Sequence, residues 1–283
     1  MTLVSRVLGF VRDLVFAQKF GASLATDAFY VAFRIPNFMR RLFAEGSFSL
    51  AFVPVLAEYR QRGDTQALRA FIDHVCGTLA GILLIVVGIG MLAAPAMVML
   101  FAPGFIDKPE KFALTADMLR ITFPYIFLIS LAGFAGGILN SFSRFALPAL
   151  SPVLLNLALI ASAIWLAPYF DQPVKALAWG VFIGGVLQLL MQLPGLMKLG
   201  LLPRPRWGWR DSGVRKVLKL MVPTLFGSSV AQVNLLFDTL VASFLVTGSV
   251  TWLYYTDRLL EFPLGIFGVA LGTVILPHLS SKH

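Results

Sequence analysis

Long apolar segments separated by short polar connections run along nearly the whole chain. Seven windows contain no Asp, Glu, Lys or Arg, namely 77–106, 121–143, 145–170, 176–197, 220–237, 239–256 and 262–281. A helix needs roughly 20 apolar residues to cross the hydrocarbon of a bilayer, and most of these windows are long enough. The pattern therefore predicts eight membrane-spanning helices, over 3–20, 27–56, 76–103, 117–140, 147–169, 174–198, 216–246 and 250–279.

The composition favours a membrane protein over a soluble one. Hydrophobic residues make up 58% of the 283-residue chain and charged residues only 13%, with a mean hydropathy of +0.83. Soluble domains carry about 25% charged residues. A soluble protein with unusually apolar helices is therefore a poor alternative. The predicted fold class is all-α, a polytopic transmembrane helix bundle.

The positive charges in the connections predict the orientation of the chain. Connections after odd-numbered spans carry two Lys or Arg residues, whereas those after even-numbered spans carry eight arginines. Positive loops remain in the cytoplasm, so the N-terminus is predicted to be cytoplasmic. Residues 203–216 also contain Trp207 and Trp209, which is typical of a segment at the lipid headgroups. Because the net charge of +9 is spread over short loops, nucleic-acid binding is not expected.

Charged residues inside the predicted spans are the least expected feature of the sequence. Six arginines and six acidic residues fall there: Arg6, Arg12, Arg34, Arg40, Arg41, Arg258, Asp13, Asp27, Glu45, Asp238, Asp257 and Glu261. An arginine at mid-bilayer costs roughly 2.5–3.5 kcal/mol on insertion scales, so such residues face the bundle interior or an aqueous cavity. They are concentrated in the first two and the last two spans. A polar cavity is therefore predicted between those four spans.

Two interpretations of these charges remain open. In the first, all of them form internal salt bridges; Arg41–Glu45 and Arg258–Glu261 have the spacing of structural pairs on a helix. In the second, some arginines bind an anion, because the planar guanidinium group engages phosphate through two parallel hydrogen bonds and always stays charged. Pro36 lacks an amide donor and is expected to kink or break the second span.

The charged spans also show a weak internal repeat. The segment from Arg12, RDLVFAQKFGASLATDAF, resembles the segment from Phe237, FDTLVASFLVTGSVTWLY, although chance similarity is the alternative. Spans one and two would then recur as spans seven and eight, as in transporters whose substrate site lies between two halves. We therefore expect an N-terminal lobe over 1–200, a basic cytoplasmic or interfacial linker over 201–215, and the start of a C-terminal lobe over 216–283.

Five segments form a more specific set of motifs. They are SRVLGFVRD at 5–13, GASLATDAFYVAFRIPNFMRRLFAEGSFSLAFVPVLAEY at 21–59, APGF at 102–105, ITFPYIFLISL at 121–131 and YYTDRLLEFPLGIFGVALGTVILPHLS at 254–280. Together they resemble the MurJ (MviN) lipid II flippases of the MOP exporter superfamily, over essentially the whole chain. The resemblance implies fourteen transmembrane helices in two lobes. About eight of these fourteen are present here, so the missing C-terminal helices would be needed for a full transporter.

The resemblance also implies a function and a set of site residues. Such proteins move lipid II, the undecaprenyl-diphosphate-linked disaccharide-pentapeptide, from the cytoplasmic to the periplasmic leaflet by alternating access, without a cofactor. By motif, the substrate-binding residues would be Arg6, Arg12, Asp27, Arg40 and Arg258, with the arginine cluster on the diphosphate. The protein would be a multi-pass component of the bacterial inner (cytoplasmic) membrane, with lipid II and membrane lipid as its partners.

Other functions remain as alternatives. Another polysaccharide-lipid flippase or a drug/cation antiporter of the same superfamily would share the fold, but a cation carrier favours acidic cavity residues. A membrane enzyme is not expected, because the chain lacks HExxH, GxSxG and DxD motifs. His74 and Cys76 are too few ligands to predict a metal site. With one cysteine, the sequence predicts no intrachain disulfide.

Overall fold

The computed structural model describes residues 2–40 and 48–260. Within these residues the chain forms helices, turns and connections, with no strand, which confirms the all-α fold class. The elements are α1 (Thr2–Phe20), α2 (Leu24–Arg40), α3 (Phe48–Gln61), α4 (Thr65–Leu92), α5 (Ala94–Phe101), η2 (Pro103–Phe105), α6 (Pro109–Thr122), α7 (Tyr125–Ser141), α8 (Ala146–Ala161), η3 (Ser162–Leu166), η4 (Ala167–Tyr169), α9 (Lys175–Lys198) and α10 (Ser212–Ser243). A further helical segment covers residues 249–260.

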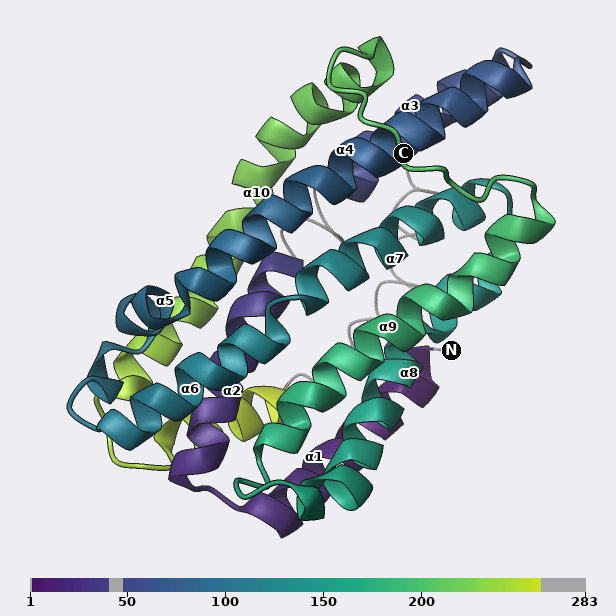
Figure 1. Cartoon of the computed structure of the whole chain (residues 1–283). Helices are drawn as coiled ribbons and strands as arrows, with labels where there is room; N and C mark the ends of the chain where they lie inside the picture. Colours follow the sequence, from purple (N-terminus) through teal and green to yellow (C-terminus); the bar gives the residue numbers. More distant parts are fainter. Residues whose placement is uncertain (1, 41–47, 261–283) are drawn as a thin grey trace, which may run out of the picture.

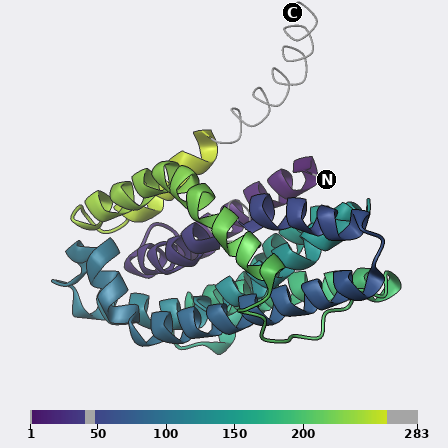
Figure 2. The same ribbon diagram turned by 90° about the horizontal axis from the view of Figure 1, so that it is seen from above.

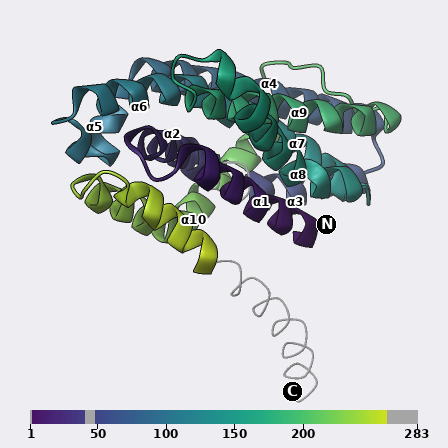
Figure 3. The same ribbon diagram turned by 90° about the horizontal axis from the view of Figure 1, so that it is seen from below.

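The helices pack in three layers, seen edge-on in Figure 2 and Figure 3. The helices α4 to α9 form one outer layer and α1 to α3 lie in the middle. The helix α10 begins beside α3 and α4, and its later part forms the opposite side with residues 249–260. Within the outer layer α9 packs against both α7 and α8 (Figure 1). The long helix α10 packs along α3, so the last described part of the chain is joined to the middle layer.

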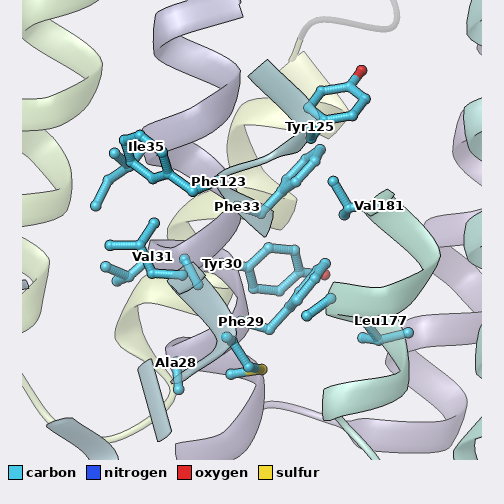
Figure 4. Close-up of a cluster of buried hydrophobic side chains, with 14 of the residues drawn as sticks. Ala28, Phe29, Tyr30, Val31, Phe33, Ile35, Phe123, Tyr125, Leu177 and Val181 are labelled. Atoms are coloured by element: carbon cyan, nitrogen blue, oxygen red, sulfur yellow. The ribbon is translucent and has the colours of Figure 1, made fainter. Parts of the chain in front are cut away.

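The helix α2 lies at the centre of the larger apolar core. Every residue over 26–33 is buried, as expected for a helix that is surrounded by other helices. Its side chains lie close to Leu177 and Val181 of α9 (Figure 4). On another side, Tyr30 stacks on Tyr254 with ring centroids 4.0 Å apart. The helix therefore connects the outer layer to the 249–260 segment.

Four described helical segments are long and apolar enough to cross a membrane, judged by length and composition: Thr65–Leu92, Pro109–Ser141, Ala146–Tyr169 and Lys175–Lys198. They correspond to predicted spans three to six. The helices α1 and α10 occupy predicted spans one and seven, and residues 249–260 begin span eight, whose remainder lies outside the described residues. The helix α4 begins eleven residues before its predicted span, because Asp64 caps its first turn by accepting the Gln66 N–H over 2.9 Å.

The second predicted span, 27–56, contains parts of two helices. The helix α2 ends at Arg40 and α3 begins at Phe48, while residues 41–47 lie outside the described part of the chain. Of the predicted kink or break at Pro36, the break does not occur, since α2 continues for four residues beyond it; the kink stays a prediction. Pro36 is buried among the packed helices, a setting in which membrane proteins tolerate an interrupted backbone ladder.

The connections gather at two ends of the molecule that differ in charge. At one end, Lys108 Nζ lies 3.4 Å from Thr247 Oγ1, so the connections after α5 and α10 meet. At the other, Glu58 Oε1 accepts a hydrogen bond from Lys216 Nζ over 2.6 Å, so the end of α3 meets the start of α10. We call the second end the basic end, because it holds Arg60, Arg62, Arg69, Arg144, Arg204, Arg206, Arg210 and Arg215.

Residues 203–211, which we call the strap, run along α4 before α10 begins. The Arg206 N–H donates to the Asp73 carbonyl over 3.1 Å, which fixes the strap to the start of α4. Asp211 then caps α10, and its Oδ1 accepts an N–H of the first turn over 3.0 Å. The last four residues of the predicted linker therefore belong to α10. The division of the chain into two lobes stays a prediction.

Candidate functional site

A cavity of about 1140 Å³ lies between α1, α2, α3, α7, α8, α9, α10 and the 249–260 segment. Its charged lining consists of five arginines and two aspartates: Arg6, Arg12, Arg34, Arg40, Arg258, Asp13 and Asp257. Among the described residues, this lining has an excess of three positive charges. The lining includes the beginning of α1, the end of α2 and the beginning of α8. The cavity therefore lies in the half of the molecule next to the basic end.

Arg12 is the most enclosed of the five arginines, with 2% of its surface exposed. Its Nη2 donates to Asp13 Oδ1 over 2.6 Å and to the Tyr254 hydroxyl over 2.7 Å. Its Nη1 donates to Asn156 Oδ1 over 3.0 Å. These contacts join α1 to α8 and to the 249–260 segment. Arg12 therefore fixes the positions of three polar side chains in the cavity wall.

Two further arginines connect α1 and α2 to the later part of the chain. Arg34 donates to Thr239 Oγ1 over 2.5 Å and to Asp257 Oδ2 over 2.8 Å. Arg258 Nε lies 3.6 Å from Asp13 Oδ2, and its side chain is 40% exposed. Asp13 therefore neutralises part of the charge of two arginines, Arg12 and Arg258, while Arg258 remains accessible from the cavity.

Arg6 and Arg40 complete the charged lining, and both are half-buried. Arg40 Nε donates to Asn37 Oδ1 over 2.9 Å, a contact within the last turn of α2. The structure thus places four of the five predicted site residues, Arg6, Arg12, Arg40 and Arg258, around one cavity. Their part in binding a substrate stays a prediction.

Asp27, the fifth predicted site residue, lies away from this cavity. It is fully buried, and its Oδ2 accepts hydrogen bonds from Lys111 Nζ and the Gly248 N–H, each over 2.7 Å. Its Oδ1 accepts from the Thr251 N–H over 2.9 Å and from the Thr251 hydroxyl over 2.7 Å. Gly248 has a φ of +99°, a conformation that other residues rarely adopt. Asp27 therefore joins α2, α6 and the start of the 249–260 segment at the end opposite the basic end.

The remaining predictions concern three residues of structural ion pairs and a possible metal site at His74 and Cys76. Arg41, Glu45 and Glu261 lie outside the described residues, and with them the predicted pairs Arg41–Glu45 and Arg258–Glu261. Over residues 2–40 and 48–260, no three His, Cys, Asp or Glu side chains gather as a metal site requires. His74 Nδ1 lies 3.5 Å from Asp211 Oδ2, and Cys76 is buried as a free thiol.

Sequence reasoning missed the uncharged polar lining of the cavity. Asn156, Gln188 and Gln192 line it, with 6%, 2% and 2% of their surfaces exposed. A signal for the two glutamines was present, since they are four residues apart in the uncharged window 176–197 and so share one helix face. Arg34 was also absent from the predicted site, because its partners lie more than 200 residues away in the sequence.

Comparison with known proteins identifies the family of this chain. The family described as Lipid II flippase MurJ matches residues 16–283. The chain belongs to the MurJ lipid II flippase family. The probable lipid II flippase MurJ of Haemophilus influenzae is 54% identical over 290 residues, which cover 100% of this chain and 57% of that protein. The lipid II flippase MurJ of Burkholderia cenocepacia is 49% identical over 286 residues, covering 100% of this chain and 55% of that protein.

A solved MurJ structure agrees with the fold. It is a lipid II flippase MurJ in an inward closed conformation, with a TM-score of 0.82 and 30% identity, covering 99% of this chain and 57% of that one. The likeness confirms the transmembrane helix bundle of MurJ type that the motifs predicted. The chain spans about half the length of the curated MurJ relatives it matches.

Proposed function

We propose that this chain supplies the diphosphate-binding cavity of a lipid II flippase in the bacterial cytoplasmic membrane. The observation that carries this proposal is the excess of three positive charges in the cavity lining. A diphosphate is a strong hydrogen-bond acceptor with several negative charges, and guanidinium groups bind it through paired, charge-assisted hydrogen bonds. The name of the matching family supports lipid II as the source of that diphosphate.

Four of the five arginines take different parts in this proposal. Arg258, with its side chain 40% exposed, and the half-buried Arg6 and Arg40 approach the diphosphate directly. Arg12 is nearly enclosed, and its hydrogen bonds to Asp13, Asn156 and Tyr254 already use most of its five N–H groups. Arg12 therefore acts mainly as a positioning residue that holds the wall against which the headgroup binds.

The positions of the cavity and of Asp27 support a proposal of alternating access. The headgroup enters from the basic end, which is the predicted cytoplasmic end, while the polyprenyl tail stays in the lipid. The contacts of Asp27 with Lys111, Gly248 and Thr251 keep the opposite end closed. Breaking those contacts would open the cavity to the periplasm, and no covalent bond of the lipid changes. The cavity thus suits a transporter, and the whole translocation cycle would also involve the rest of a MurJ-length protein.

A drug/cation antiporter and another polysaccharide-lipid flippase remain as alternatives of the same fold. The excess of positive charge in the cavity would repel an organic cation, so the antiporter is the less favoured alternative. Another diphosphate-linked lipid would satisfy the same arginines. The lipid II name of the family is the reason to prefer lipid II.

The proposal is tested by measuring lipid binding to the purified chain with native mass spectrometry. We expect undecaprenyl diphosphate to bind and undecaprenol, which lacks the phosphates, to bind much more weakly. Arg258→Ala and Arg40→Ala should each weaken undecaprenyl diphosphate binding by about 10- to 100-fold. This is the range expected when one charge-assisted hydrogen bond, worth about 1.5–3 kcal/mol, is lost.

The matched control is Arg144→Ala, which removes one positive charge from an exposed connection outside the cavity. It should leave undecaprenyl diphosphate binding within about twofold of the unmodified chain, since exposed charges are screened by salt. Equal binding of undecaprenol and undecaprenyl diphosphate would contradict the proposal. So would unchanged binding in the Arg258→Ala and Arg40→Ala variants.

A further inference from the structure

Two glutamines of α9 form an uncharged polar patch in the wall of the cavity. Gln188 and Gln192 are one helical turn apart, and both line the cavity. Each is 2% exposed, so both amides have been removed from bulk solvent. They stand in the window 176–197, which is otherwise apolar apart from backbone groups. A buried amide in such a helix is costly unless it has partners.

The acceptor atoms of these amides lack partners. Within the described residues, neither Gln188 Oε1 nor Gln192 Oε1 accepts a hydrogen bond. The orientation of the Gln188 amide is fixed, because its Nε2 donates to the Ser151 carbonyl over 2.8 Å and leaves Oε1 unpaired. A buried carbonyl oxygen without a donor destabilises the fold. Two such oxygens one turn apart are therefore a reason to look for a ligand that supplies donors.

The wall of the cavity beside Gln192 is formed by glycines of α7. Gly133, Gly136 and Gly137 of α7 also line the cavity, so α7 contributes no side chain at these three positions. A Cβ atom at Gly136 would lie 3.2 Å from Gln192 Oε1. A side chain at this position would therefore crowd that oxygen.

We infer that Gln188 and Gln192 bind the uncharged, hydroxyl- and amide-bearing part of the headgroup, its sugars, while the arginines bind the diphosphate. An ionised diphosphate offers acceptors and no donors, so it cannot satisfy a glutamine oxygen. Sugar hydroxyls and N-acetyl N–H groups are donors. The two sets of residues therefore recognise different parts of one ligand. This inference rests on the proposed function, and it assigns the sugar-recognising residues within the same cavity.

The test compares two ligands on the same purified chain. Lipid II carries diphosphate and sugars, whereas undecaprenyl diphosphate carries the diphosphate alone. Gln192→Met keeps the length of the side chain and removes the acceptor. We expect this variant to bind lipid II about 5- to 10-fold more weakly and undecaprenyl diphosphate with unchanged affinity. Its thermal midpoint without ligand should not fall, because the substitution removes an unsatisfied buried oxygen.

A second variant and a control complete the experiment. Gly136→Ala places a methyl group beside Gln192 Oε1. It should also weaken the binding of lipid II without weakening the binding of undecaprenyl diphosphate. Leu190→Met introduces the same residue as the first variant at a position that is 52% exposed on the outer side of α9. It should change neither affinity. The two cavity variants act by different means, so a folding defect in one leaves the other to decide the question.

The outcomes separate this inference from the function on which it rests. Selective loss of lipid II affinity in the cavity variants supports the inference. If both ligands bind as tightly to Gln192→Met and Gly136→Ala as to the unmodified chain, only water satisfies the amides and the inference is wrong. Equal loss for both ligands would also refute it. Failure of undecaprenyl diphosphate to bind the unmodified chain would instead refute the proposed function, and the inference with it.

Discussion

At the scale of single residues, the ion pair of Asp27 and Lys111 allows a test of how much stability is lost when a buried charge loses its partner. Their atoms lie 2.7 Å apart, and both side chains are at most 2% exposed. Removing one partner of a buried pair strands the other charge and costs about 3–5 kcal/mol. We expect Asp27→Asn to lower the free energy of unfolding by that amount, measured as a lower thermal midpoint in detergent. Adding Lys111→Met should recover part of the loss, because it removes the stranded charge.

The control for this pair is Asp117→Asn. Asp117 makes ion pairs with Arg120 and Lys175, but its side chain is 47% exposed. Exposed pairs contribute about 1 kcal/mol or less, so this variant should melt close to the unmodified chain. If the double variant were no more stable than Asp27→Asn alone, the charge of Lys111 would not be the source of the loss.

The sequence allowed a better prediction of the charged residues around the cavity than of the position of Asp27 in the fold. Arginines in apolar spans are expected to share a polar cavity, and the resemblance to the family picked out Arg6, Arg12, Arg40 and Arg258, which all line it. The position of Asp27 depends on a lysine 84 residues later and on backbone N–H groups 221 and 224 residues later. Charge and spacing along the sequence contain no information on such partners.

At the scale of elements, the strap shows how two glycines of α4 make a docking surface. A Cβ atom at Gly77 would overlap the backbone of Arg206, and one at Gly81 would lie 2.5 Å from the Trp207 ring. We expect Gly77→Val to detach the strap and to speed tryptic cleavage after Arg206 and Arg210 several-fold. Gly88→Val, on the same helix with no atom within 4 Å of its added Cβ, should leave the cleavage rate unchanged. Equal cleavage in both variants would contradict the docking argument.

The helical kind of the elements could be predicted, but the number of helices and their ends depend on contacts that the apolar pattern does not contain. The spans over α8, η3, η4 and α9 were predicted within two residues, because uncharged windows coincide with those helices. The helix α4 extends well into a charged segment, since Asp64 can cap it there. Pro36 stays inside α2 because the surrounding core holds the helix together.

At the scale of the whole molecule, the two ends should lie on opposite sides of the membrane. Ala22 and Asp107 lie at the end without the arginine group, and Gln61 lies at the basic end; all three are exposed. Cysteines at Ala22 and Asp107 should react with an impermeant thiol reagent in intact cells, and one at Gln61 should not. The natural Cys76 is 7% exposed and should contribute little background. Labelling at Gln61 alone would reverse the predicted orientation.

The hydrogen bonds of Asp27 also have a kinetic consequence. Four donors from Lys111, Gly248 and Thr251 converge on the two oxygens of one carboxylate. One carboxylate is hydrogen-bonded to several segments here. When it moves away from one segment, all its hydrogen bonds to that segment break at once, and its remaining hydrogen bonds become longer and less well aligned. Separation of α2, α6 and the 249–260 segment at this end would therefore be a single activated step with one barrier, and its rate would depend steeply on temperature.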